Sequence, residues 1–218
     1  MEQIKVKLPG INDFFTQEAY KTLRTNLQFC GPDVRVIAFT SSSENEGKTT
    51  VSLHTAKSLA ELGKSVLFVD ADMRKSVLAG RNTNVKNAAG LCEVLTGMKA
   101  VADCVYETQY THLHIMFAGK YPPNPVELLD GKYFSKLVEE ARNVYDYIII
   151  DTPPLGMVID AAVIAPNCDG TILVVNCGKA RYRHVKEVIS QLERSGSKIL
   201  GVVRNNVNQQ KKVYYKKG

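Results

Sequence analysis

The feature that most constrains the fold is an apolar run that leads through a polar loop into a helical pattern. The run covers residues 34–40, the loop covers residues 41–46, and Gly47-Lys48-Thr49 opens the helix. Backbone N–H groups at the start of a helix, together with the positive end of the helix dipole, form a concave anion site. This order of strand, loop and helix is the context that a phosphate-binding P-loop requires.

Each residue type in this loop has a physical task. Lys48 can reach the outer phosphates of a nucleotide, the Thr49 hydroxyl can ligate Mg²⁺, and Gly47 lets the backbone approach a phosphate without an intervening Cβ. Ser42 replaces the first glycine of the usual G-x-x-x-x-G-K-[ST] pattern, whereas Asn45 is a residue that tolerates a left-handed backbone. Taken alone, a G-K-T tripeptide is also compatible with an ordinary helix start that contains a lysine.

Two further apolar runs end in acidic residues. Residues 65–69 lead into Asp70 and Asp72, and residues 145–150 lead into Asp151. Ionised aspartates are rarely buried without a partner, and ligands of an open α/β sheet bind at the carboxyl ends of its strands. Asp151 matches the Walker B position, at which a carboxylate holds Mg²⁺ directly or through water. Together the three strand ends predict a nucleotide–Mg²⁺ site.

The alternation of apolar strands with helical patterns predicts the fold class. It implies an α/β fold of the P-loop NTPase type, with a doubly wound, mostly parallel sheet and helices on both faces. Further strands are expected over residues 113–118, 171–176 and 198–203, and helices over about 12–30, 47–61, 91–96, 131–143 and 181–194. Asp160 is expected to begin another helix. We expect an irregular arm over residues 1–11 and little other regular structure over residues 75–111.

Length and composition are typical of one globular domain. The chain has 218 residues, of which 44% are hydrophobic and 23% charged, so we expect one domain over residues 1–207, with an arm and helix over 1–30 and a tail over 208–218. No apolar run reaches the ~18 residues of a membrane span, and the N-terminus does not resemble a signal peptide, which predicts a cytoplasmic protein. Five cysteines without C-x-x-C spacing predict reduced thiols.

The net charge of +6 is partly concentrated in the tail. Its last eight residues carry four lysines and the adjacent Tyr214 and Tyr215. A basic tail is compatible with nucleic acid, with an anionic membrane surface or with a solvated chain end. We favour the solvated end over nucleic acid, and the two tyrosines point to a further role.

Four segments together resemble the bacterial tyrosine kinases, or BY-kinases. They are residues 18–29, 43–49, 66–74 and 148–154, and the resemblance is closest to the stand-alone kinase subunit of capsular or exopolysaccharide operons. Asp70-Ala-Asp72-Met-Arg74 is similar to the Walker A′ motif of that family. Partition and division-site ATPases share the P-loop and Walker B motifs but usually carry an additional lysine early in the loop. This chain has Ser41-Ser42-Ser43 there, which favours the kinase branch.

The resemblance implies ATP and Mg²⁺ as cofactors and gives each motif residue a role. Lys48 would neutralise the transferring phosphate, and Asp70 would accept the proton of the attacking tyrosine. Mg²⁺ would be held, directly or through water, by Thr49, Asp72 and Asp151. The residues that would bind ATP are Asn205, at the position that contacts adenine in the family, and Ser43, Glu44, Asn45, Glu46, Gly47, Lys48, Thr49 and Thr50.

The resemblance also bears on the first helix and on the tail. Glu18, Lys21 and Arg24 share one helix face, and spacing alone predicts a solvated face with weak ion pairs. In the family, an E-x-x-R-x-x-R helix packs against a neighbouring subunit in a ring, so a homo-oligomeric ring is expected, with Lys21 replacing the first arginine. Family members end in tyrosines that are phosphorylated between subunits. Tyr214 and Tyr215 are the candidate acceptors, the alternative being that they are ordinary tail residues.

The function that this resemblance implies is an ATP-dependent protein-tyrosine autokinase that regulates capsular or exopolysaccharide polymerisation and export. A transmembrane adaptor of the polysaccharide co-polymerase type would recruit it to the inner face of the membrane, and a tyrosine phosphatase would reset it. The chief alternative is a partition-type ATPase that dimerises with ATP and forms no phosphotyrosine. A non-catalytic nucleotide-binding scaffold is a third possibility, which the complete set of Lys48, Asp70, Asp72 and Asp151 disfavours.

Overall fold

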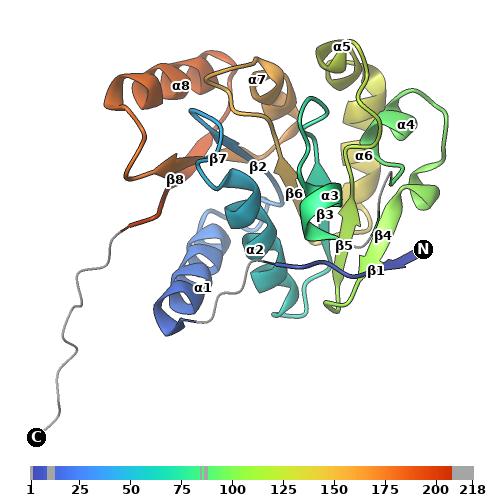
Figure 1. The fold of residues 1–218 in the computed structure, drawn as a ribbon, viewed down its shortest axis with the longest axis horizontal. Helices are drawn as coiled ribbons and strands as arrows, with labels where there is room; N and C mark the ends of the chain where they lie inside the picture. The colour runs from blue at the N-terminus through green and yellow to red at the C-terminus, as the bar shows by residue number, and fades with distance from the viewer. Residues whose placement is uncertain (1, 9–12, 84, 86–87, 208–218) are drawn as a thin grey trace, which may run out of the picture.

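One eight-stranded sheet runs through the part of the chain that this computed structural model describes, residues 2–8, 13–83, 85 and 88–207 (Figure 1). In the order of their pairing, its strands are β1 (Glu2–Ile4), β4 (Val105–Thr108), β5 (Leu113–Met116), β3 (Val66–Asp70), β6 (Tyr147–Asp151), β2 (Val36–Ser41), β7 (Gly170–Asn176) and β8 (Ile199–Asn205). Neighbouring strands are parallel except β4 and β5. The predicted mostly parallel α/β sheet is therefore confirmed.

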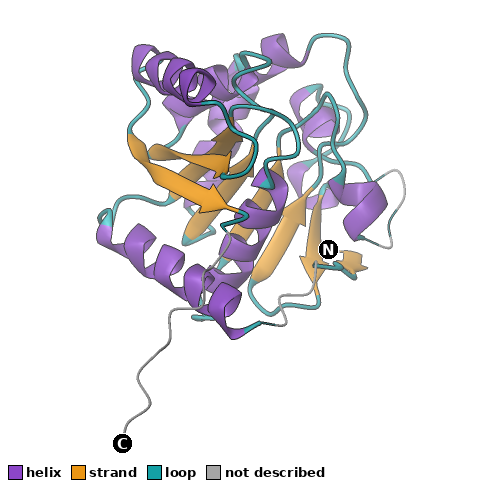
Figure 2. Ribbon diagram, turned by 60° about the vertical axis from the view of Figure 1, so that its left-hand side comes forward, coloured by secondary structure: helices purple, strands orange, loops and turns teal. Residues whose placement is uncertain are grey.

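Helices cover both faces of this sheet (Figure 2). One face carries α1 (Phe14–Phe29), α2 (Lys48–Ala60) and α3 (Leu78–Asn82). The other carries α4 (Leu91–Leu95), α5 (Pro125–Leu129), α6 (Lys132–Arg142), α7 (Asp160–Ile164) and α8 (Tyr182–Arg194), with the 3₁₀ turns η1 (Val101–Asp103) and η2 (Ala165–Asn167) in the connections. Helices α1, α2, α6 and α8 lie where the apolar periodicity predicts them, and α7 begins at Asp160 as predicted.

The core forms because successive side chains of each strand point to opposite faces. In β2, Ile37 and Phe39 pack under α1 and α2, whereas Val36 and Ala38 face the side of α6 and α7. All four are fully buried. A parallel sheet covered on both faces reads as a continuous apolar run, which is the pattern from which its strands were predicted.

Two expectations about the less regular segments are wrong. Residues 1–11 are not irregular throughout, because Glu2–Ile4 form β1 and pair in parallel with β4. The stretch 75–111 contains β4 and α3 in addition to the expected short helix. Strands of three or four residues are too short to show a period, and β1 finds its partner far along the chain, so neither had a local signal.

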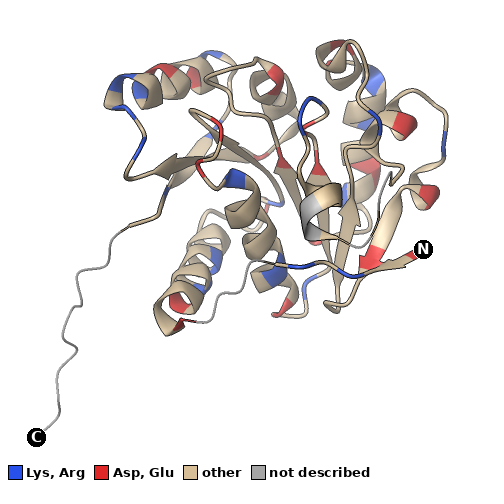
Figure 3. Ribbon diagram, viewed as in Figure 1, with Lys and Arg blue, Asp and Glu red and all other residues tan. Residues whose placement is uncertain are grey.

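Strand order brings the predicted functional segments together. β3, β6 and β2 are consecutive in the sheet, and their carboxyl ends meet at one edge because they are parallel. Figure 3 shows the acidic ends of β3 and β6 side by side, in agreement with the pairing of Asp70 with Asp151. Within the described ranges, no helix has the length and apolar character that crossing a membrane requires.

Candidate active site at the carboxyl ends of three strands

The loop between β2 and α2 contains two residues with left-handed backbone angles. Asn45 has φ 60° and Gly47 has φ 86°, both in the left-handed region. A Cβ on Gly47 would lie 2.0 Å from Asn205 Nδ2. Asn205, at the end of β8, donates this Nδ2 to the carbonyl of Glu46 at 2.9 Å. The backbone angle of Gly47 favours glycine, and a Cβ at this position would also displace the Asn205 amide.

The buried side chain of Glu46 accepts hydrogen bonds within the loop. Its side chain is 2% exposed, and Oε2 accepts hydrogen bonds from the backbone N–H groups of Ser42 and Ser43 at 2.7 and 2.9 Å. The Ser42 hydroxyl donates to the same oxygen at 2.9 Å. The serine that replaces the usual first glycine therefore takes part in a local network that fixes the loop. From the sequence alone, Glu46 is predicted only as one of the ATP-binding residues.

The carboxylate of Asp151 contacts three polar side chains in the first turns of α2. Lys48 Nζ lies 2.7 Å from Asp151 Oδ1, the Thr49 hydroxyl donates to Oδ2 at 2.6 Å, and the Ser52 hydroxyl donates to Oδ1 at 3.0 Å. Lys48 is 7% exposed and Asp151 1% exposed. A buried ion pair needs such additional hydrogen bonds to offset the loss of hydration. Ser52, one turn into α2, was missed from the sequence because only the fold brings it to β6.

Asp70 lies beside this network on β3. It is 2% exposed, and burial, followed by the neighbouring Asp151 carboxylate, raises the pKa of Asp70 to about 7. The Ser76 hydroxyl donates to Asp70 Oδ2, and the backbone N–H of Asp72 donates to Oδ1 at 3.1 Å. A carboxylate whose pKa lies near neutrality is suited to accept a proton during a reaction.

Asp72 lies in a tight turn that follows β3, here called the A′ turn (residues 71–76). It is half-buried, and its Oδ1 accepts the backbone N–H groups of Arg74 and Lys75 at 3.2 and 2.9 Å. Lys75 Nζ reaches Glu44 Oε2 at 3.0 Å, so the A′ turn also contacts the P-loop. Asp70 and Asp72 therefore lie at the end of β3, and Asp151 lies at the end of the adjacent β6.

The donor chemistry fits a magnesium ion that is shared with a nucleotide. Among the described residues, no group of three or more His, Cys, Asp or Glu side chains is arranged to hold a metal by itself. Mg²⁺ normally binds proteins through one or two carboxylates plus phosphate oxygens and water. The Thr49 hydroxyl and the carboxylates of Asp72 and Asp151 are the groups here that would supply oxygen ligands of this kind.

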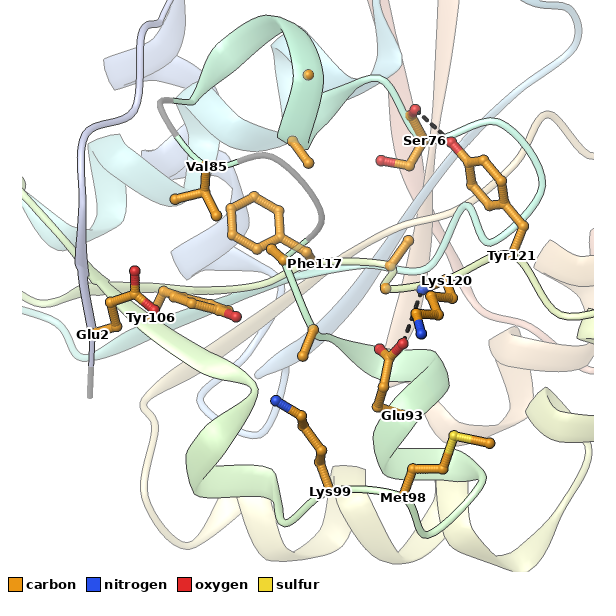
Figure 4. A pocket seen from close by; sticks show the side chains of 16 residues that line it. Glu2, Ser76, Val85, Glu93, Met98, Lys99, Tyr106, Phe117, Lys120 and Tyr121 are labelled. Atoms are coloured by element: carbon orange, nitrogen blue, oxygen red, sulfur yellow. Dashed lines mark hydrogen bonds between the residues drawn. The ribbon is translucent and has the colours of Figure 1, made fainter.

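A pocket of about 1310 Å³ opens beside the A′ turn (Figure 4). Its walls include Phe117, Tyr121 and Lys120. The Tyr121 hydroxyl donates to the Ser76 carbonyl at 3.0 Å, while the Ser76 side chain contacts Asp70. The pocket thus shares the A′ turn with the candidate active site.

The residues predicted to form an oligomer interface divide into two groups. Glu18 and Lys21 form an exposed ion pair of 2.7 Å on α1. Arg24 instead points toward α2, where its Nη1 donates to the Ser58 carbonyl at 2.8 Å. Arg24 therefore helps to hold α1 against α2 within one chain. The tail tyrosines, Tyr214 and Tyr215, lie outside the described residues.

Known proteins are similar to this chain in sequence and in fold. The family model described as an AAA domain matches residues 34–199. The tyrosine-protein kinase CpsD of Streptococcus agalactiae is 43% identical over 199 residues, which cover 91% of this chain and 87% of the relative. The chimerical protein CapA2B2 has a similar structure, with a TM-score of 0.85 at 29% identity and coverage of 96% of this chain and 95% of the other.

Two further structures separate the kinases from the division-site ATPases. The kinase domain of the Escherichia coli tyrosine kinase ETK has a TM-score of 0.83 at 32% identity, covering 92% of this chain and 79% of that one. The septum site-determining protein MinD of Pyrococcus horikoshii, complexed with Mg-ADP, has a TM-score of 0.65 at 27% identity, covering 81% and 72%. Because the kinases match more closely on every one of these measures, this nucleotide-binding chain belongs to the bacterial tyrosine-protein kinases.

Proposed function

We propose that this chain uses ATP and Mg²⁺ to phosphorylate Tyr214 and Tyr215 in the tail of a second copy. The observation that carries the proposal is the pairing of Asp70 with Asp151 at adjacent strand ends, together with the contact of Lys48, at the start of α2, with Asp151. Phosphoryl transfer requires positioning and charge neutralisation rather than covalent chemistry by the protein. The buried ammonium and carboxylates supply both.

The proposed step is an in-line displacement. The tyrosine oxygen attacks the γ-phosphorus, the bond from that phosphorus to the β,γ-bridging oxygen breaks, and ADP leaves. The tyrosine proton passes to the carboxylate of Asp70; in the metal-free protein, burial raises the pKa of this group to about 7, within the range of a general base. Lys48 neutralises charge on the phosphoryl oxygens. Mg²⁺, when bound through Thr49, Asp72 and Asp151, supplies further neutralisation of the phosphates.

The base of ATP is proposed to lie near Asn205. The side-chain amide of Asn205 donates to the Glu46 carbonyl and lies close to Gly47, so Asn205 borders the P-loop. Ser43, Glu44, Asn45 and Thr50 would complete the nucleotide site through the loop and the first turn of α2. This assignment follows the family resemblance at the end of the last strand.

We extend the family's assembly to this chain as part of the same proposal. A homo-oligomeric ring would bring the tail of one copy to the site of the next, with the exposed Glu18–Lys21 pair at the contact. A transmembrane adaptor would recruit the kinase to the inner face of the membrane, and a phosphatase would reverse the modification. The cellular role would be control of capsular or exopolysaccharide polymerisation and export, which the similarity to CpsD supports.

Transfer between copies can be tested by dividing enzyme and acceptor between two full-length variants. The Tyr214→Phe/Tyr215→Phe variant keeps the site, and Lys48→Met keeps both tyrosines. Mixed with Mg·ATP and the cytoplasmic segment of the proposed adaptor, they should yield phosphate on the Lys48→Met chain only, while neither variant alone should gain mass. Phosphate release without phosphotyrosine in the wild type would favour the partition-type ATPase instead.

A further inference from the structure

A buried aspartate outside the three sequence motifs contacts the A′ turn. Asp160, the first residue of α7, is fully buried. Arg74 Nε donates to Asp160 Oδ1 at 2.9 Å, whereas Asp160 Oδ2 has no hydrogen-bond partner among the described residues. A buried carboxylate requires a partner, and Arg74 is the ion-pair partner that the structure gives Asp160.

This ion pair joins two segments that carry candidate metal ligands. Arg74 belongs to the A′ turn, and its backbone N–H donates to Asp72 Oδ1 at 3.2 Å. Asp160 lies in the segment that follows β6, the strand that ends in Asp151. The side chain of Arg74 is therefore held by Asp160, in the segment that follows β6. The backbone of Arg74 orients the carboxylate of Asp72, within the A′ turn itself.

We propose that Asp160 is a positioning residue that holds Arg74 and thereby sets Asp72 at a fixed spacing from Asp151. The proposal rests on the proposed function, in which Asp72 and Asp151 share one Mg²⁺. Residues that orient metal ligands from outside the coordination sphere typically change metal affinity by about 10- to 100-fold when they are replaced. A similar effect is expected here.

Arg74 and Asp160 differ in burial, so the effect of breaking their ion pair on the A′ turn can be separated from a general loss of stability. The Arg74 side chain is 38% exposed, so it can turn toward water when its partner loses its charge. Asp160→Asn keeps the shape and removes the cost of a buried charge, and it need not destabilise the fold. Arg74→Ala is a poorer test because it leaves a buried charge unpaired. Asp160→Asn is therefore the variant of choice.

The test combines two measurements on the full-length protein. Hydrogen–deuterium exchange of residues 71–76, in metal-free and nucleotide-free protein, reports whether the A′ turn is held in place. A Mg²⁺ titration of the binding of a fluorescent ATP analogue reports how well the ligands are positioned. Asp169→Asn is the matched control, since it removes the charge of the Arg142–Asp169 pair, which contacts the start of β2, at the end of the strand away from the P-loop.

For Asp160→Asn we expect faster exchange at residues 71–76 and a rise of about tenfold in the Mg²⁺ concentration at half-saturation. Asp169→Asn should change neither. If exchange at residues 71–76 in Asp160→Asn equals that of the wild type, the positioning role is wrong, whatever the titration shows. Asp72→Asn tests the proposed metal site separately: if it leaves the Mg²⁺ dependence of wild-type binding unchanged, the metal assignment fails while the exchange result still decides whether Asp160 holds the turn.

Discussion

Replacing Asp70 by asparagine should stabilise the metal-free protein at neutral pH, although it removes the proposed proton acceptor. Burial, followed by the Asp151 carboxylate, raises the pKa of Asp70 from 3.8 to about 7. In the unfolded chain the carboxyl ionises near its ordinary pKa, so ionisation favours the unfolded state wherever the pH exceeds that value. Asparagine has nearly the same shape and carries no charge. Its side-chain oxygen can accept the backbone N–H of Asp72, while its Nδ2 donates to the Ser76 hydroxyl oxygen.

The magnitude follows from the change in the pKa of Asp70. About three units separate 3.8 from about 7, and each unit corresponds to about 1.4 kcal/mol. Because the folded-state pKa is raised, the resulting penalty is absent below about pH 4, grows as the pH rises and levels off above about pH 7. The gain in the free energy of unfolding should therefore be about 4 kcal/mol at pH 7.5 and about 2 kcal/mol at pH 5.

Urea denaturation in the presence of EDTA measures this gain at the two pH values. The chelator matters because a bound cation would hold the carboxylate ionised. The reasoning is refuted if Asp70→Asn is no more stable than the wild type at pH 7.5, or if its gain is equal at both pH values. An equal gain would mean that packing, and not the buried charge, is responsible.

Two further predictions concern the loop and the opposite end of the sheet. Gly47→Ala should lower nucleotide affinity about tenfold, because alanine at φ 86° costs about 1–2 kcal/mol and its Cβ would displace the Asn205 amide from the Glu46 carbonyl. Gly63→Ala, at φ 76° with open space around it, controls for backbone strain outside the loop. Equal losses of affinity in a binding titration would contradict the argument. Asp169→Asn should cost about 2 kcal/mol at pH 7. Burial raises the pKa of Asp169, but hydrogen bonds from Arg142 and two backbone N–H groups outweigh it and lower the pKa below 3.8. Its stabilisation is therefore present above about pH 4 and lost as the pH falls; urea unfolding that shows the same cost at pH 3 and pH 7 would argue against this.

The motifs of the candidate site were predictable because nucleotide chemistry dictates the residue types at strand ends. Lys48, Asp70, Asp72 and Asp151 are lysine and aspartates placed where apolar runs stop, and a parallel sheet must bring such ends to one edge. The same reasoning predicted the layers of the fold, because buried parallel strands are continuously apolar.

The remaining contacts could not be predicted from the sequence. Some join residues that are distant in the sequence, and others are made by side chains that point into a loop, such as Glu46. Ser52 and Asp160 are ordinary residues at helix positions until the fold sets them against Asp151 and Arg74. Helical spacing placed Arg24 on a face but could not say that this face borders α2. Strand β1 has no signal at all without β4.

Tyrosine transfer itself is tested most directly by intact mass spectrometry of the full-length wild-type chain. The protein is incubated with Mg·ATP and the cytoplasmic segment of the proposed adaptor, beside a Lys48→Met control. The account predicts added phosphates that map to Tyr214 or Tyr215 in the wild type and no mass gain in the control. Turnover of ATP by the wild type with no gain in mass would contradict it.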